Sequence, residues 1–156
     1  MKQALARTLS RTGDGLWYPT AILLASFAVP ERFFELIFQA CVGFAFHLVA
    51  YTQIKQRVRR PRPFQAALAG ERPTVLPLDE YSFPSGHSAS AAFLAILLCS
   101  YVPMLAWVAI PWVLGVSWSR YRLGVHYLSD LVGGWALGLV SALVTQLISG
   151  WVFRVV

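Results

Sequence analysis

Residues 81–119 read YSFPSGHSASAAFLAILLCSYVPMLAWVAIPWVLGVSWS, a run of 39 residues without Lys, Arg, Asp or Glu. A helix that crosses a lipid bilayer needs about 20 apolar residues, so this run is long enough for two short membrane spans. Pro103 lies near its middle and supplies a place for the chain to turn. The run therefore predicts two helices that cross the membrane in opposite directions.

Uncharged runs also dominate the rest of the chain, at 15–30, 36–54 and 131–153. Of the 156 residues, 57% are hydrophobic and only 13% are charged, and the mean hydropathy is +0.58. This composition excludes a disordered chain and an ordinary soluble domain. We expect a single domain, 1–156, that folds as an all-α integral membrane helical bundle. Its transmembrane segments, about five, are predicted at 16–30, 33–54, 87–102, 104–119 and 128–153.

Three parts of the chain are less regular. The segment 16–30 is short and contains Pro19, so it either spans the membrane or inserts only in part. Residues 1–15 carry three basic side chains and suit either a basic helix on the lipid headgroups or a frayed tail. Residues 55–81 hold four prolines and predict a polar loop.

The order of the segments places their polar ends on one side of the membrane. If the second segment ends at Lys55, the third begins near His87 on the same side. The fourth then returns to that side near Arg120, and the fifth leaves from it near His126. A charged pocket at the surface avoids the cost of placing charges within hydrocarbon. We therefore expect one polar site there, covered by the 55–81 loop.

The first polar cluster, residues 55–63, reads KQRVRRPRP and holds five cations within eight residues. Such a density of positive charge attracts anions, and it places Lys55 and Arg62 next to the membrane. A basic run beside a membrane helix is also a common topology anchor. From this cluster alone, both interpretations stay open.

The second cluster, residues 82–90, reads SFPSGHSAS and opens the third segment. Ser85 can cap the helix, and Gly86 lets a ligand approach the backbone closely. Free amides at a helix start favour phosphate or carboxylate. His87 in the first turn adds a titratable group, although a hydrogen-bonded structural histidine is the competing interpretation.

The third cluster, residues 119–130, reads SRYRLGVHYLSD. His126 and Asp130 are four residues apart, so on a helix they share one face and the carboxylate can accept the Nδ1–H of the imidazole. That contact leaves Nε2 as an oriented lone pair, as a nucleophile or base requires. The alternative is an Asp at a helix start that pairs with a nearby cation.

Together the three clusters supply cations, a hydroxyl, a backbone amide and two histidines at one surface. This combination fits a tetrahedral oxyanion. In phosphoryl transfer, charge is spread over three equatorial oxygens while bonds form and break along one axis. Two histidines can act at the two ends of that axis.

The same residues resemble the three motifs of the type 2 phosphatidic acid phosphatase family, which is related to bacterial acid phosphatases and vanadium haloperoxidases. They cover residues 55–130, and the hydropathy fits the membrane branch of the family. The matching patterns are Lys55-x6-Arg62-Pro63, Pro84-Ser85-Gly86-His87 and Ser119-Arg120-x5-His126-x3-Asp130.

The resemblance implies a mechanism that uses neither a metal nor a cofactor. It makes His126 the nucleophile that forms a phosphohistidine, with Asp130 orienting it and His87 protonating the leaving group. The phosphate ligands that it implies are Lys55, Arg62, Ser85, Gly86 and Arg120.

The implied substrate is a lipid phosphate or diphosphate, of the phosphatidic acid, phosphatidylglycerol phosphate or polyprenyl diphosphate class. A lipid phosphotransferase with the same intermediate and a non-catalytic lipid-anion binder stay open as alternatives. The expected partners are the lipid and the bilayer, with no nucleic acid, and the oligomeric state is not indicated. We expect an integral protein of the bacterial cytoplasmic (inner) membrane.

The side of the membrane that holds the site is left unassigned. If 16–30 spans, the site side carries eleven Lys and Arg against two, which favours the cytoplasm; if it does not, the count is eight against five. Membrane members of the family commonly carry six helices, and the resemblance favours an extracytoplasmic site. Here the lysine motif ends the second segment instead of the third.

Three further features are predicted to be structural. Gly134 and Gly138 form a small-xxx-small pair, for which we favour contact between helices of one chain over dimerisation. His47 is expected to be a hydrogen-bonded interior residue. Asp79 and Glu80 are the only adjacent acidic pair, and a solvated loop is favoured for them over a magnesium site.

Overall fold

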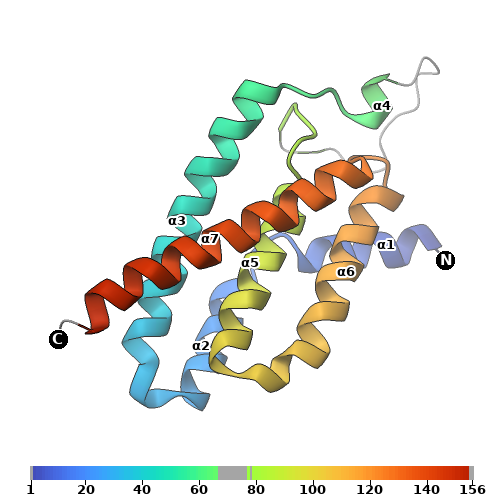
Figure 1. The fold of residues 1–156 in the computed structure, drawn as a ribbon. Helices are drawn as coiled ribbons and strands as arrows, with labels where there is room; N and C mark the ends of the chain where they lie inside the picture. The colour runs from blue at the N-terminus through green and yellow to red at the C-terminus, as the bar shows by residue number, and fades with distance from the viewer. Residues whose placement is uncertain (1, 67–76, 78, 155–156) are drawn as a thin grey trace.

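The computed structural model describes residues 2–66, 77 and 79–154, and these residues form helices joined by short turns (Figure 1). No strand occurs among them, which confirms the predicted all-α membrane bundle. Two short 3₁₀ turns, η1 (Pro30–Arg32) and η2 (Pro103–Leu105), connect longer helices. The α-helices are α1 (Lys2–Thr12), α2 (Tyr18–Ala28), α3 (Phe33–Val58), α4 (Pro63–Ala66), α5 (Gly86–Tyr101), α6 (Ala106–Arg122) and α7 (Leu128–Arg154).

The five predicted segments correspond to α2, α3, α5, α6 and α7. By length and composition, two helical stretches are long and apolar enough to cross a membrane, Pro30–Gln65 and Leu128–Phe153, while α2 and α5 are shorter apolar helices. Five spans therefore remain a prediction. Much of the predicted 55–81 loop, residues 67–76 and 78, lies outside the described residues.

The third helix extends beyond its predicted end at residue 54. It continues to Val58, and Arg59 then adopts a left-handed conformation with a φ of 48°. The backbone N–H of Arg59 donates to the carbonyl of Lys55 at 3.0 Å, which closes the helix. Lys55 is thereby a residue of the last helical turn, and the loop begins four residues later.

Helix α5 lies at the centre, and α7 crosses it closely through two glycines. A Cβ atom at Gly134 would lie 2.7 Å from the carbonyl oxygen of Ser85, and one at Gly138 would lie 2.6 Å from that of Ala89. Real Cβ atoms do not approach so closely, so glycine is required at both positions. This contact confirms that the small-xxx-small pair packs within one chain.

The segment between α1 and α3 runs the full length of α5. At one end Asp14 contacts His87 in the first turn of α5, with 2.8 Å between Oδ1 and Nε2. At the other end the guanidinium of Arg32 lies 4.3 Å from the ring centre of Tyr101, the last residue of α5. Segment 16–30 therefore extends along the same length of the bundle as α5, and a membrane crossing by either remains a prediction.

The N-terminal residues form a helix, so the frayed-tail alternative is wrong. Helix α1 packs on α6, where it buries Ala6 and Ser10 and leaves Arg7 and Arg11 exposed. Figure 1 shows α1 running across the direction of α6. This distribution is the one expected of an amphipathic helix on a membrane surface, and contact with headgroups remains a prediction.

Candidate active site

The polar clusters meet at one end of the bundle, at the top of Figure 1, as the order of segments predicts. There α3 ends, α5 begins, α6 ends and α7 begins. Backbone contacts join them: the N–H of Ser85 donates to the carbonyl of Asp130 at 2.9 Å, and that of Ser82 donates to Arg60 at 2.8 Å. Side chains join the same elements: Arg60 and Asp130, which are 70 positions apart in the sequence, form an ion pair at 2.9 Å.

Two buried cations at this end share one carboxylate. Lys55 is 4% exposed and Arg62 is 1% exposed. Lys55 Nζ and Arg62 Nη2 each lie 2.5 Å from Oδ1 of Asp79, and the Tyr51 hydroxyl lies 2.5 Å from Oδ2. Asp79 lies in a loop with its side chain 37% exposed, as predicted, but its carboxylate also supplies the counter-charge that the two buried cations need.

The environment of Asp79 keeps its carboxyl group ionised. Burial acts to raise the pKa of Asp79, but hydrogen bonds from Lys55 and Tyr51 and the charges of Lys55 and Arg62 outweigh it and hold the pKa below its usual value. Asp79 therefore carries a negative charge next to Lys55 and Arg62.

Arg62 also reaches His126. Its Nη1 donates to the carbonyl of Val125 at 2.8 Å and lies 3.4 Å from Nε2 of His126. A guanidinium can only donate hydrogen bonds, so Nε2 is the accepting nitrogen and the neutral imidazole carries its proton on Nδ1. The lone pair of His126 therefore faces the side of the site that holds the cations.

His126 is neutral in this site. Burial lowers its pKa to about 4; Asp130 opposes the shift, and the charges of Arg62, Arg120 and Lys55 add to it. All three cations proposed from the sequence therefore act on one imidazole. A neutral imidazole that keeps a lone pair on Nε2 is the form that a nucleophile requires.

The contact between His126 and Asp130 is looser than predicted. Nδ1 and Oδ2 are 3.6 Å apart, which is longer than a hydrogen bond, and Nδ1 is buried without a hydrogen-bond partner among the described residues. The reason is that α7 begins at Leu128, so the two residues do not share a helical face. Asp130 instead accepts the backbone N–H of Tyr127 at 2.8 Å and Nη1 of Arg60 at 2.9 Å.

Ser85 caps α5 as predicted, and a chain of hydrogen bonds orients its hydroxyl. Trp135 Nε1–H donates to Ser117 Oγ at 2.9 Å, Ser117 donates to Ser88 Oγ at 3.1 Å, and Ser88 donates to Ser85 Oγ at 3.1 Å. The indole N–H can only donate, and in this direction each hydroxyl of the chain donates to the next. The proton of Ser85 is thus left to donate into the site. Gly86 lies beside it, where a Cβ would be 2.9 Å from the ring of Tyr51.

His87 and Arg120 are both held by the N-terminal segment. His87 Nε2 lies 2.8 Å from Asp14 Oδ1, and Arg120 Nη1 donates to Ser10 Oγ at 2.7 Å. Arg120 is 4% exposed, and its Nε has no hydrogen-bond partner among the described residues. A buried cation with an unused donor is well suited to an anionic ligand.

Sequence reasoning missed the polar residues that hold the predicted ones in place. Arg60 was hidden within the basic run, and nothing in the spacing of Ser10, Asp14 or Asp79 connects them with a histidine or an arginine. The predicted interior position of His47 is confirmed: the residue is buried, and its Nε2 lies 3.1 Å from Ser90 Oγ.

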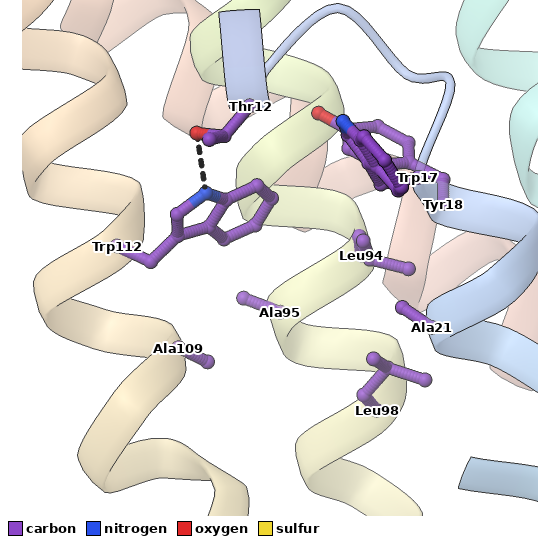
Figure 2. Close-up of a pocket in the computed structure, with 9 residues that line it drawn as sticks. All are labelled: Thr12, Trp17, Tyr18, Ala21, Leu94, Ala95, Leu98, Ala109 and Trp112. Atoms are coloured by element: carbon purple, nitrogen blue, oxygen red, sulfur yellow. Dashed lines mark hydrogen bonds between the residues drawn. The ribbon is translucent and has the colours of Figure 1, made fainter. Parts of the chain in front are cut away.

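Apolar pockets flank the helices below the polar site. One has a volume of about 440 Å³ and lies between α2, α5 and α6 beneath a hydrogen bond of 3.0 Å from Trp112 Nε1 to Thr12 Oγ1 (Figure 2). A second, of about 660 Å³, lies between α2, α3 and α5 and includes Gly15 and Ser90 among its lining residues. Both have mainly apolar walls, as a site for a hydrocarbon chain requires.

Most of the chain is similar to known proteins. The model of the PAP2 superfamily matches residues 36–154. Decaprenylphosphoryl-5-phosphoribose phosphatase of Mycobacterium tuberculosis is 35% identical over 151 residues, which cover 94% of this chain and 80% of the relative. Undecaprenyl-diphosphatase of Sulfolobus acidocaldarius is 32% identical over 136 residues, covering 83% and 62%.

A solved structure has the same fold. The crystal structure of a transmembrane PAP2 type phosphatidylglycerolphosphate phosphatase from Bacillus subtilis matches with a TM-score of 0.67 and 22% identity, covering 92% of this chain and 74% of that one. At this identity the likeness establishes the arrangement of the helices.

Proposed function

Because the chain belongs to the PAP2 superfamily, we propose that it is a membrane phosphatase that hydrolyses a lipid phosphate through a phosphohistidine on His126. The observation that carries the proposal is the position of Arg62, whose Nη1 lies 3.4 Å from the accepting Nε2 of His126. It puts a fixed cation beside the nucleophilic lone pair, where an equatorial phosphoryl oxygen would lie during attack.

In the first step, Nε2 of His126 attacks the phosphorus atom in line with the leaving lipid oxygen. The bond from phosphorus to that oxygen breaks, and the oxygen takes a proton from His87. Lys55, Arg62 and Arg120 hold the phosphoryl oxygens together with the Ser85 hydroxyl and the Gly86 amide. The long Arg62 contact is readily exchanged for one to a phosphoryl oxygen.

In the second step, water replaces the imidazole. His87, now neutral, accepts a proton from the water as the water oxygen bonds to phosphorus and the bond from phosphorus to Nε2 breaks. Inorganic phosphate leaves, and His126 returns to its neutral form. No metal takes part in either step.

A phosphate carried on a polyprenyl lipid is the proposed substrate class. The names of the Mycobacterium tuberculosis and Sulfolobus acidocaldarius relatives refer to decaprenyl and undecaprenyl compounds. The apolar pocket of about 660 Å³ supports this class, because it adjoins the polar site and can hold the lipid tail. Of its lining residues, Gly15 is the neighbour of Asp14, and Ser90 is one helical turn from His87. The headgroup can then reach the site without leaving the membrane surface.

The cytoplasmic face of the bacterial inner membrane is the proposed position of the site. Segment 16–30 runs along the whole length of α5, which supports the count of Lys and Arg in which α1 lies on the same side as the site. Among the described side chains, the opposite end carries Arg32, whereas the site end carries, besides the proposed ligands, Arg7, Arg11, Arg57, Arg59, Arg60 and Arg122. An excess of basic residues marks the cytoplasmic side.

Phosphate release from purified protein in detergent, with excess chelator, tests the proposal. We expect release from a polyprenyl-linked phosphate in water alone. Loss of substrate that requires an added lipid or sugar alcohol would identify a phosphotransferase, and binding without turnover would identify a lipid-anion carrier. A panel that includes phosphatidic acid and phosphatidylglycerol phosphate separates acyl from isoprenyl substrates.

A further inference from the structure

The N-terminal segment lies outside the matched family region, 36–154, yet it contacts two of the predicted site residues, His87 and Arg120. Asp14 Oδ1 is 2.8 Å from His87 Nε2, although the two residues are 73 positions apart. Ser10 Oγ accepts from Arg120 Nη1 at 2.7 Å, and both of those side chains are buried. Two independent contacts thus join one segment to two predicted site residues.

The turn that presents Asp14 is closely determined. A Cβ at Gly13 would lie 2.8 Å from Val116 Cγ1 and 3.2 Å from His87 Cδ2, so the backbone can sit against the imidazole only because residue 13 is glycine. The Tyr18 hydroxyl donates to the Gly13 carbonyl at 3.2 Å. Gly15 has a φ of 86°, a conformation that favours glycine. The position of Asp14 is therefore set by its neighbours on both sides.

The charges that face His87 come from three elements. Burial, which has the largest effect, and Arg120 on α6 oppose a positive charge on the imidazole, while Asp14 and the more distant Asp79 favour one. Asp14 is the carboxylate in direct contact with the ring. Nδ1 of His87 makes no hydrogen bond to any residue in the described part of the chain, so it is the nitrogen left to face a substrate.

We propose that Asp14 is a positioning residue for His87: it accepts Nε2–H, holds the ring and favours the charged imidazolium, so that Nδ1–H can be given to the leaving lipid oxygen. This inference rests on the proposed phosphatase function. The proton moves from Nδ1 to the oxygen as its bond to phosphorus breaks, and Asp14 keeps its negative charge throughout.

The leaving group provides the test. A lipid phosphate has a poor alkoxide leaving group that needs protonation, whereas para-nitrophenyl phosphate does not. Asp14→Asn should lower kcat/KM for the lipid by roughly tenfold or more and change that for the aryl phosphate by less than about threefold. Asp14→Glu should recover most of the lost activity. In the pH profile of lipid turnover, the alkaline limb of Asp14→Asn should fall at a lower pH than that of the wild type.

Glu31→Gln is the matched control, since it removes an exposed carboxylate at the opposite end of α2 and should leave both substrates unaffected. Equal losses on both substrates in Asp14→Asn, or no loss on either, would overturn the inference. If Asp14→Asn does not fold, Asp14→Ser takes its place: a loss on the lipid that spares the aryl phosphate would support the inference, and equal losses on both substrates would overturn it. A wild-type protein that releases phosphate from neither substrate would instead refute the phosphatase function.

Discussion

The guanidinium Nη2 of Arg62 lies 2.5 Å from Oδ1 of Asp79, and Lys55 pairs with the same oxygen. Both cations are proposed phosphate ligands, so a phosphoryl group has to compete with Asp79 for them. A charged hydrogen bond contributes about 1.5–3 kcal/mol, which makes this competition large enough to measure as an affinity.

Asp79→Asn should tighten the binding of orthovanadate, which mimics the trigonal-bipyramidal phosphoryl group, by roughly fivefold or more. The amide keeps the size of the side chain but cannot neutralise the two cations. Inhibition constants in detergent measure the effect. Glu80→Gln removes the adjacent exposed carboxylate and should not change the constant. Weaker binding in Asp79→Asn would mean that Asp79 orders the cations for phosphate.

His126→Ala should abolish turnover of every substrate, including para-nitrophenyl phosphate, while orthovanadate still binds through the cations. The loss should be on the order of a thousandfold or more, because the proposed covalent route is removed entirely. Rapid acid-free quenching of the wild type with labelled lipid should trap a phosphohistidine that the variant lacks. Retained turnover by the variant would exclude His126 as the nucleophile.

The stability of the fold should fall on acidification because His126 is buried and neutral. Burial lowers its pKa from 6.5 to about 4, so between these values the unfolded chain binds more protons than the folded one. The contribution of His126 to the free energy of unfolding is then fully present above its unfolded pKa. It is lost as the pH falls towards the folded pKa, by up to about 3 kcal/mol. Unfolding midpoints from about pH 7 to about pH 4.5 should drop more for the wild type than for His126→Asn; parallel curves would contradict this.

Gly134→Ala should weaken both the fold and the activity. The added Cβ would lie 2.7 Å from the carbonyl of Ser85 and push α7 away from the start of α5, at a cost of about 1–3 kcal/mol. Gly150→Ala is the matched control on the same helix, where a Cβ meets nothing within 4 Å. Thermal unfolding in detergent should show a loss for the first variant and none for the second.

The membrane topology should place the C-terminus opposite the site. With α1 on the cytoplasmic side and five crossings, the chain ends outside the cytoplasm. An alkaline phosphatase fused after residue 156 should be active and a green fluorescent protein at the same position dark in bacterial cells. The opposite pair of results would put the site on the extracytoplasmic face.

The sequence by itself determined the helices and the end of the bundle at which they meet. Uncharged runs of about 16–39 residues can only bury their backbone polar groups in lipid as helices, and the parity of the crossings brings Lys55, His87, Arg120 and His126 to one side. Both conclusions depend on local composition and chain order, which a sequence records directly.

Only the tertiary structure decided which groups touch. The Asp14–His87 and Arg62–Asp79 pairs join segments that no periodic pattern connects. The second pair forms because the buried charge of Arg62 must find a partner wherever the packing brings one. Likewise, the separation of 3.6 Å between His126 and Asp130 depends on α7 beginning at Leu128. A spacing of four residues fixes a shared face only if both residues are already helical.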